Sequence, residues 1–161
     1  MAQVEVIGIR IEFPSNQPVL ILREISSPRF LPLWIGVPEA DAISMTLDEV
    51  EVPRPLTHDL LLDVVENFND RLQSVEITEL VDGVFYAVLN FATHESISAR
   101  PSDAVALALR AQAPIYVADE VLAEAGQFIS EESEADQVEG ADDELEQFRE
   151  FLEQIKPEDF S

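Results

Sequence analysis

The chain has 161 residues, 47% of them apolar, so it is long enough to form one globular domain with a sizeable core. It contains no cysteine, which excludes disulfide scaffolds and thiolate metal sites and fits a reducing compartment. Nine basic residues face 33 acidic ones, and the resulting net charge of −24 opposes general binding to nucleic acid.

The N-terminal residues MAQVEVIGIR lack a basic segment followed by a long apolar run, so we expect no signal peptide. No apolar run in the sequence is long enough to span a bilayer. We therefore expect a cytoplasmic protein without a membrane role.

The first part of the chain predicts three strands joined by short polar turns. Residues 4–13 alternate apolar and polar side chains, residues 19–24 form a continuous apolar run, and residues 30–36 form a third run interrupted by Pro32. The proline indicates a sheet edge or a bulge, because it cannot donate a hydrogen bond to a neighbouring strand. Such a meander can also pair across a symmetry axis, so a homodimer is a secondary expectation.

Helices and strands alternate in the middle of the chain. Four segments carry helical patterns: residues 37–50, 57–72, 101–112 and 119–126. Strand patterns occupy residues 73–80 and 84–93, which form a hairpin, and residues 95–100 and 114–118. We predict an α+β domain over residues 1–129, with a mixed or antiparallel sheet built from the meander and the later hairpin and with three to four helices packed on it.

One of these helices has a pronounced apolar stripe. In residues 57–72 the stripe consists of Leu60, Leu61, Val64, Val65 and Phe68. A stripe of this kind is typical of a helix that packs on a core.

The last fifth of the chain differs in composition. Residues 130–161 hold 13 acidic residues against Arg149 and Lys156, a net charge of −11. Residues 130–142 have almost no apolar side chains and are predicted to be a disordered linker. Residues 143–161 predict an amphipathic helix, which we expect to dock on its own domain, on a sister subunit or on another protein.

Two segments share one pattern, RPLTHDLL at 54–61 and RPSDAVAL at 100–107. The shared residues are Arg54, Thr57 and Asp59 in the first, and Arg100, Ser102 and Asp103 in the second. The hydroxyl and carboxylate groups are sufficient helix-start signals. An arginine before a helix N-terminus also outlines an anion site, although an internal ion pair is its more frequent use in an acid-rich chain.

The carboxylates offer a second kind of site, because phosphodiester hydrolysis usually needs a divalent cation and Mg²⁺ or Mn²⁺ takes oxygen ligands. The candidate groups are Glu39, Asp41, Asp59 and Asp103, with His58 as a base or a ligand. Their linear spacing does not show that they converge, and a helix N-terminus disfavours a cation beside it. No glycine-rich phosphate loop and no hydrolase elbow is present in the sequence, and we expect no organic cofactor.

Several separated segments together resemble the bifunctional nuclease domain family. They are VEVIGIRIEFPSNQPVLILRE, LPLWIGVPEADAI, RPLTHDLL, ITELVDGVFYAVL and ARPSDAVALALRAQAPIYVADEVL, in this order. The resemblance covers residues 1 to about 128, and the tail is similar to an extension of some bacterial members. It implies an α+β fold, nuclease activity on DNA and RNA, and dimeric members. The matching motif positions are Glu39, Arg54, His58, Asp59, Arg100, Ser102 and Asp103.

The leading hypothesis is a nuclease that hydrolyses phosphodiesters in DNA or RNA with the help of Mg²⁺ or Mn²⁺. The expected phosphate-binding residues are Arg54, Arg100 and Ser102. The expected catalytic residues are Glu39, His58, Asp59 and Asp103, with Asp59 and Asp103 as metal ligands and His58 as general base.

Two alternatives stay open. One is a non-enzymatic regulatory or interaction module whose acidic tail helix docks on a partner. The other is a dimeric domain that binds a small anion such as a phosphorylated metabolite. Both avoid the conflict between a nucleic-acid partner and the charge of −24. The nuclease hypothesis resolves this conflict if Arg54 and Arg100 form a small basic mouth and metal ions neutralise the acids nearby.

Overall fold

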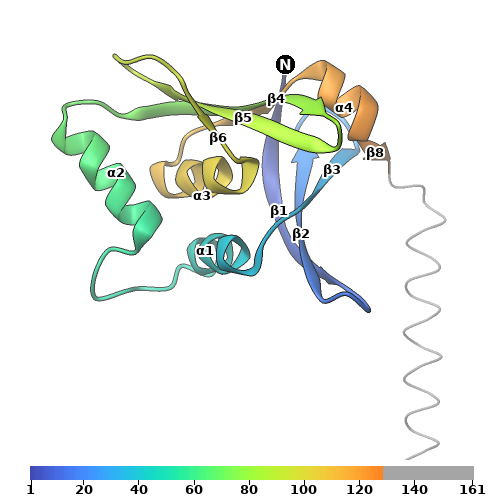
Figure 1. Cartoon of the computed structure of the whole chain (residues 1–161), viewed down its shortest axis with the longest axis horizontal. Helices are drawn as coiled ribbons and strands as arrows, with labels where there is room; N and C mark the ends of the chain where they lie inside the picture. The colour runs from blue at the N-terminus through green and yellow to red at the C-terminus, as the bar shows by residue number, and fades with distance from the viewer. Residues whose placement is uncertain (129–161) are drawn as a thin grey trace, which may run out of the picture. The chain divides into compact units, whose positions relative to one another are not determined.

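The computed structural model describes residues 1–128 of the chain (Figure 1). The predicted linker at 130–142 and the predicted helix at 143–161 lie outside the described residues. No helix within residues 1–128 has the length and apolar character needed to cross a membrane.

The predicted meander is confirmed. Strands β1 (Ala2–Glu12), β2 (Gln17–Glu24) and β3 (Arg29–Trp34) pair antiparallel in chain order. A two-residue strand, β8 (Gln127–Phe128), pairs with β3 only at Arg29 and Phe30. Pro32 therefore lies on a stretch of β3 that has β2 as its only paired neighbour in the described sheet, which agrees with the edge position predicted for it.

The rest of the sheet comes from the second half of the domain. Its strands are β4 (Leu72–Val81), β5 (Val84–Phe91), β6 (Ile97–Ala99) and β7 (Ile115–Val117). The described sheet has eight strands in the order β6-β5-β4-β7-β1-β2-β3-β8. Strand β7 pairs parallel with β4 and antiparallel with β1, so it joins the hairpin to the meander.

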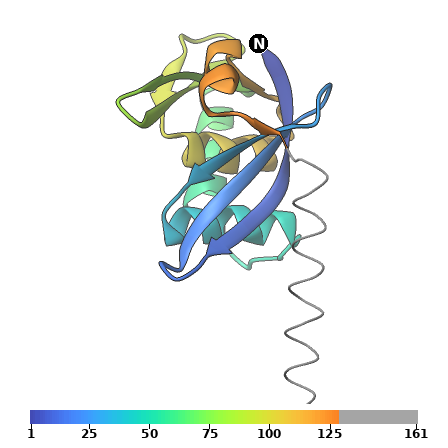
Figure 2. The same ribbon diagram turned by 90° about the vertical axis from the view of Figure 1, so that its right-hand side faces the viewer.

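Four helices complete the domain: α1 (Val37–Leu47), α2 (Thr57–Asn67), α3 (Pro101–Ala111) and α4 (Asp119–Ala125). The α+β class is thus confirmed. Figures 1 and 2 show α1 and α3 on the same side of strands β1, β2 and β3. Helix α3 is the most deeply buried of the four, since every residue from Ala104 to Ala108 is at most 2% exposed. This helix is therefore a rigid base for any side chain at its first turn.

Helix α2 differs from its prediction. Its apolar stripe was expected to pack on the core, but α2 has no buried residue, and Leu60, Val64 and Phe68 are 52%, 43% and 73% exposed. The hydrophobic pattern predicted the start of the helix correctly, but the helix ends at Asn67 rather than at residue 72, which begins β4. The predicted burial of the stripe is wrong, because Leu62, which is not part of the stripe, packs against the core.

Candidate functional site

A cavity of about 1250 Å³ lies between α1, α2, α3 and strand β6. Most of its lining is apolar, and six ionisable side chains contribute to it: Glu39, Asp41, His58, Arg100, Asp103 and Arg110. This volume is somewhat larger than the roughly 300–1,000 Å³ that is usual for ligand-binding pockets. The cavity is therefore the place in the described domain where polar groups from three helices meet.

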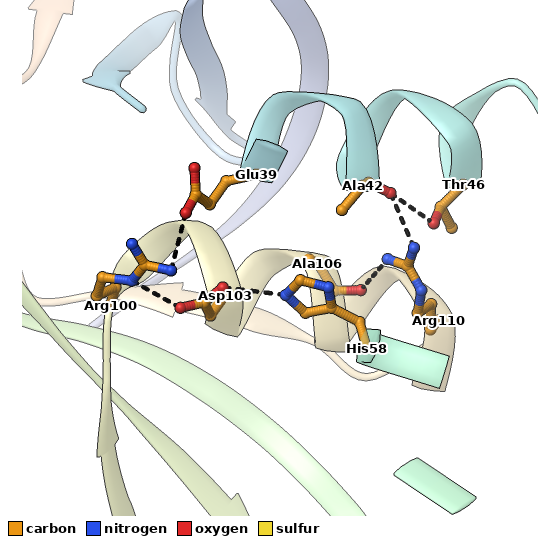
Figure 3. Close-up of polar contacts among 8 residues, drawn as sticks. All are labelled: Glu39, Ala42, Thr46, His58, Arg100, Asp103, Ala106 and Arg110. Atoms are coloured by element: carbon orange, nitrogen blue, oxygen red, sulfur yellow. Dashed lines mark hydrogen bonds and ion pairs between the residues drawn. The ribbon is translucent and has the colours of Figure 1, made fainter. Parts of the chain in front are cut away.

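Arg100 connects α1 to the first turn of α3 (Figure 3). It is the N-cap of α3 and has extended dihedral angles, as expected for a residue before proline. Its Nε donates to Asp103 Oδ2 at 2.7 Å, and its Nη2 lies 2.9 Å from Glu39 Oε1. Because the Arg100 side chain is still 66% exposed, its guanidinium remains accessible to a ligand anion.

Asp103 also connects α3 to α2. Its Oδ1 lies 3.0 Å from His58 Nε2, a contact between residues 45 positions apart in the chain. Burial raises the pKa of Asp103, but hydrogen bonds from Arg100 and His58 outweigh this effect and hold the pKa below its ordinary value. The hydrogen bond to Asp103 in turn raises the pKa of Arg100. Asp103 is therefore an ionised acceptor that can orient the His58 imidazole.

A second contact between α2 and α3 involves Arg110, which the sequence reasoning missed. Its Nε donates to Asp59 Oδ1 at 2.8 Å, and its side chain is only 8% exposed. Arg110 lies about two helical turns beyond Asp103 and thus on the same face of α3. That spacing is the one sequence signal that could have indicated it.

The predicted site residues fall into two groups. Glu39, His58, Arg100 and Asp103 come together, and each lines the cavity. The candidate metal ligand Asp41 also lines the cavity. The twin segments meet through His58 and Asp103 rather than through their two arginines.

Three predicted residues do not line this cavity: Arg54, Asp59 and Ser102. Arg54 is exposed and makes no ion pair with any of residues 1–128. Ser102 is buried in the first turn of α3, at 7% exposure. Asp59 uses both oxygens, one for Arg110 and one for the backbone N–H of Leu56.

The acidic residues of the domain do not form a ready metal centre. Within residues 1–128, no group of three or more histidine, aspartate or glutamate side chains is arranged to hold a metal ion. Glu39 and Asp103 both face Arg100, which occupies the position that a cation between them would need. The donor set of the described domain therefore does not fit a metal held by the protein alone.

Comparison with known proteins identifies the family. A sequence model described as "Bifunctional nuclease domain" matches residues 20–130. The uncharacterized protein Rv1829 of Mycobacterium tuberculosis strain H37Rv is 50% identical over 161 residues, which cover 99% of this chain and 98% of that protein. Bifunctional nuclease 1 of Oryza sativa subsp. indica is 27% identical over 108 residues, 63% of this chain and 33% of the rice protein. The chain belongs to the bifunctional nuclease domain family.

Proposed function

We propose that the protein is a cytoplasmic nuclease that hydrolyses phosphodiester bonds of RNA or DNA in the cavity between α1, α2, α3 and β6. The observation that carries the proposal is the exposed Arg100 guanidinium beside the His58–Asp103 pair. In attack on a phosphodiester, a planar cation can stabilise the charge that develops on the phosphate oxygens, and an oriented imidazole can accept a proton from the attacking water.

Each side chain has one role in this proposal. Arg100 binds the non-bridging phosphate oxygens, and Glu39 holds its guanidinium through Nη2. His58 accepts a proton from the attacking water as the water oxygen bonds to phosphorus. The bond between phosphorus and the leaving sugar oxygen breaks, and that oxygen takes a proton from solvent. Ionised Asp103 orients the ring and stabilises the imidazolium that forms, which later returns its proton to solvent. Asp59 has no role in the chemistry because both of its oxygens are engaged.

The proposal routes no step through a metal, because the described residues do not form a metal-ligand set. Mg²⁺ or Mn²⁺ can still assist by arriving with the phosphates of the substrate. Such an ion would also reduce the repulsion between a polyanion and a chain of charge −24. Parallel assays with Mg²⁺, with Mn²⁺ and with EDTA measure how far activity depends on it.

The test uses the purified full chain with single-stranded and duplex RNA and DNA. His58→Gln and Arg100→Gln should each lower kcat/KM by about 10²-fold or more, the usual effect of removing a positioned proton acceptor or an oxyanion-stabilising group. Arg10→Gln is the matched control, because Arg10 is exposed on β1 and does not line the cavity. Wild-type activity in both cavity variants, or no cleavage by the wild-type chain, would refute the proposal.

A second candidate function is protein interaction. The uncovered apolar stripe of α2, with Leu60, Val64 and Phe68, favours it. The partner would be either a second copy of this chain or another protein that covers the stripe. Sedimentation of the full chain and of Val64→Glu compares the two oligomeric states, and a monomer in both cases would exclude self-association through α2.

A further inference from the structure

The side-chain polar contacts between helix α2 and helix α3 lie in the first turn of α2. No residue of α2 is fully buried, and Leu62 is partly buried against the core, so hydrophobic burial contributes less to the position of α2 than to that of α3. The first turn carries His58, whose side chain is only 17% exposed at the cavity. The polar contacts of this turn are therefore the ones placed to set the orientation of the imidazole.

Arg110 makes contacts with three helices, and Figure 3 draws those with α1 and α3. Its Nη2 donates to the carbonyl oxygen of Ala42 in α1 at 3.0 Å, and its Nη1 donates to that of Ala106 in α3 at 2.9 Å. Its Nε donates to the carboxylate of Asp59 in α2. Because the guanidinium is planar and rigid, these acceptors are held in one fixed arrangement.

The second oxygen of Asp59 fixes the start of α2. It accepts the backbone N–H of Leu56, the N-cap residue, at 2.9 Å. His58 immediately precedes Asp59 in the chain. Because Asp59 binds both Arg110 and the backbone of Leu56, it connects Arg110 to the backbone on both sides of His58. Because the Arg110 side chain is buried, its contact with Asp59 restricts the position of this turn relative to α3.

We propose that Arg110 is a positioning residue, which acts through Asp59 to hold the first turn of α2 so that the His58 imidazole contacts Asp103. The catalytic consequence rests on the proposed nuclease function, whereas the placement of His58 can be measured without any substrate. Arg110 itself touches no reacting group in this scheme.

Nuclear magnetic resonance of the full chain tests the placement directly. The chain has only two histidines, so His94→Gln assigns the two imidazole Cε1–H signals. Asp103→Ala gives the His58 signal without its carboxylate partner. Arg110→Met removes all three side-chain contacts of Arg110. Arg110→Lys keeps the positive charge but loses the planar arrangement of donors. Asp59→Asn weakens only the contact between Arg110 and α2.

Arg29→Met is the matched control for a loss of stability alone. Arg29 is also partly buried, at 23% exposure, and pairs with Glu24 at 2.9 Å. Neither residue lines the cavity. The control therefore removes a comparable ion pair that has no contact with α2.

We expect Arg110→Met to move the His58 signal to its position in Asp103→Ala, with a smaller displacement in Arg110→Lys and Asp59→Asn. The His94 signal should stay in place in all three, and Arg29→Met should displace neither signal. An unchanged His58 signal in Arg110→Met, or an equal displacement in Arg29→Met, would overturn the inference. If Arg110→Met does not fold, Arg110→Lys and Asp59→Asn decide by the same criterion.

Activity separates this inference from the nuclease proposal. If the wild-type chain cleaves nucleic acid, Arg110→Lys should lower kcat about tenfold and leave KM within about twofold, because Arg100 still binds the phosphate. If the wild-type chain cleaves nothing, the nuclease proposal fails, and the His58 signals still decide whether Arg110 positions α2.

Discussion

The pair of Asp59 and Arg110 predicts an unequal response to removing either partner. Asp59→Asn leaves the Arg110 guanidinium, 8% exposed, without a counter-charge. Arg110→Met leaves Asp59 about a third exposed and still bonded to the N–H of Leu56. The acceptors released by Arg110→Met keep other donors, since the Ala42 carbonyl also accepts from Thr46 Oγ1. Asp59→Asn should therefore be the more destabilising change.

The magnitudes follow from burial. Breaking a fully buried pair by removing one partner costs about 3–5 kcal/mol, and an exposed pair contributes about 0–1 kcal/mol. With one partner buried and the other partly exposed, we expect about 2 kcal/mol for Asp59→Asn and about 1 kcal/mol for Arg110→Met. The double variant should cost about 1 kcal/mol, because it no longer holds a buried unpaired charge.

Urea unfolding followed by circular dichroism measures the four free energies of this double-mutant cycle. The expected coupling between the two changes is about 2 kcal/mol. A double variant whose cost equals the sum of the single variants would show that the two side chains do not interact. A greater loss for Arg110→Met than for Asp59→Asn would contradict the argument from the buried charge.

Three further measurements test other parts of the structure. Burial raises the pKa of Asp70, but hydrogen bonds from His94, Arg71 and Thr93 hold that pKa well below its ordinary value. The ionised Asp70 carboxylate should therefore stabilise the folded state fully above about pH 4 and progressively less below it. Thermal unfolding of Asp70→Asn should show a weaker acid dependence than that of the wild type. A Cβ at Gly36 would clash with Glu39 Oε2, so Gly36→Ala should displace the Glu39 side chain from Arg100. We expect KM for nucleic acid to rise, with a loss of folding stability under about 1 kcal/mol. An unchanged KM would show that Glu39 does not contribute to phosphate binding. A plot of the logarithm of DNA affinity against the logarithm of salt concentration should have a slope of only about −1, as expected for a single phosphate contact by Arg100. A slope steeper than about −4 would indicate many phosphate contacts and would contradict this expectation.

The helices and strands were predictable from the sequence because their signals are local. Period-two alternation identifies β1, short apolar runs identify β2 and β3, and the turn residues delimit the later hairpin of β4 and β5. The prolines at 38 and 101 mark the starts of α1 and α3. The two-residue strand β8 was missed because so short a segment carries no periodicity. The place of β7 between β1 and β4 depends on pairing between distant segments, which no local pattern records.

The site was predictable in its residue types but not in its pairings. The repeated Arg-Pro pattern identified Arg100 and Asp103, and α3 begins where the proline required. The same pattern treated Arg54 as the equivalent of Arg100, yet Arg54 is exposed outside the cavity. Both aspartates are at the third position of their helices. Asp59 pairs with Arg110 of α3, and Asp103 pairs with Arg100, the N-cap of α3. The pattern therefore described two similar helix starts, and their different surroundings gave them different partners.

The distribution of arginines bears on how an acidic chain would bind a polyanion in the proposed function. Of the seven arginines in residues 1–128, four are paired with carboxylates of the domain: Arg23, Arg29, Arg100 and Arg110. Only Arg100 among these four combines high exposure with a position in the cavity. In the proposed function the apolar lining of the cavity adds binding energy, and unpaired bases can contact it whereas a stacked duplex cannot. The proposal thus favours single-stranded nucleic acid over duplex, and equal cleavage of both would require phosphate contacts by exposed arginines outside the cavity, such as Arg54.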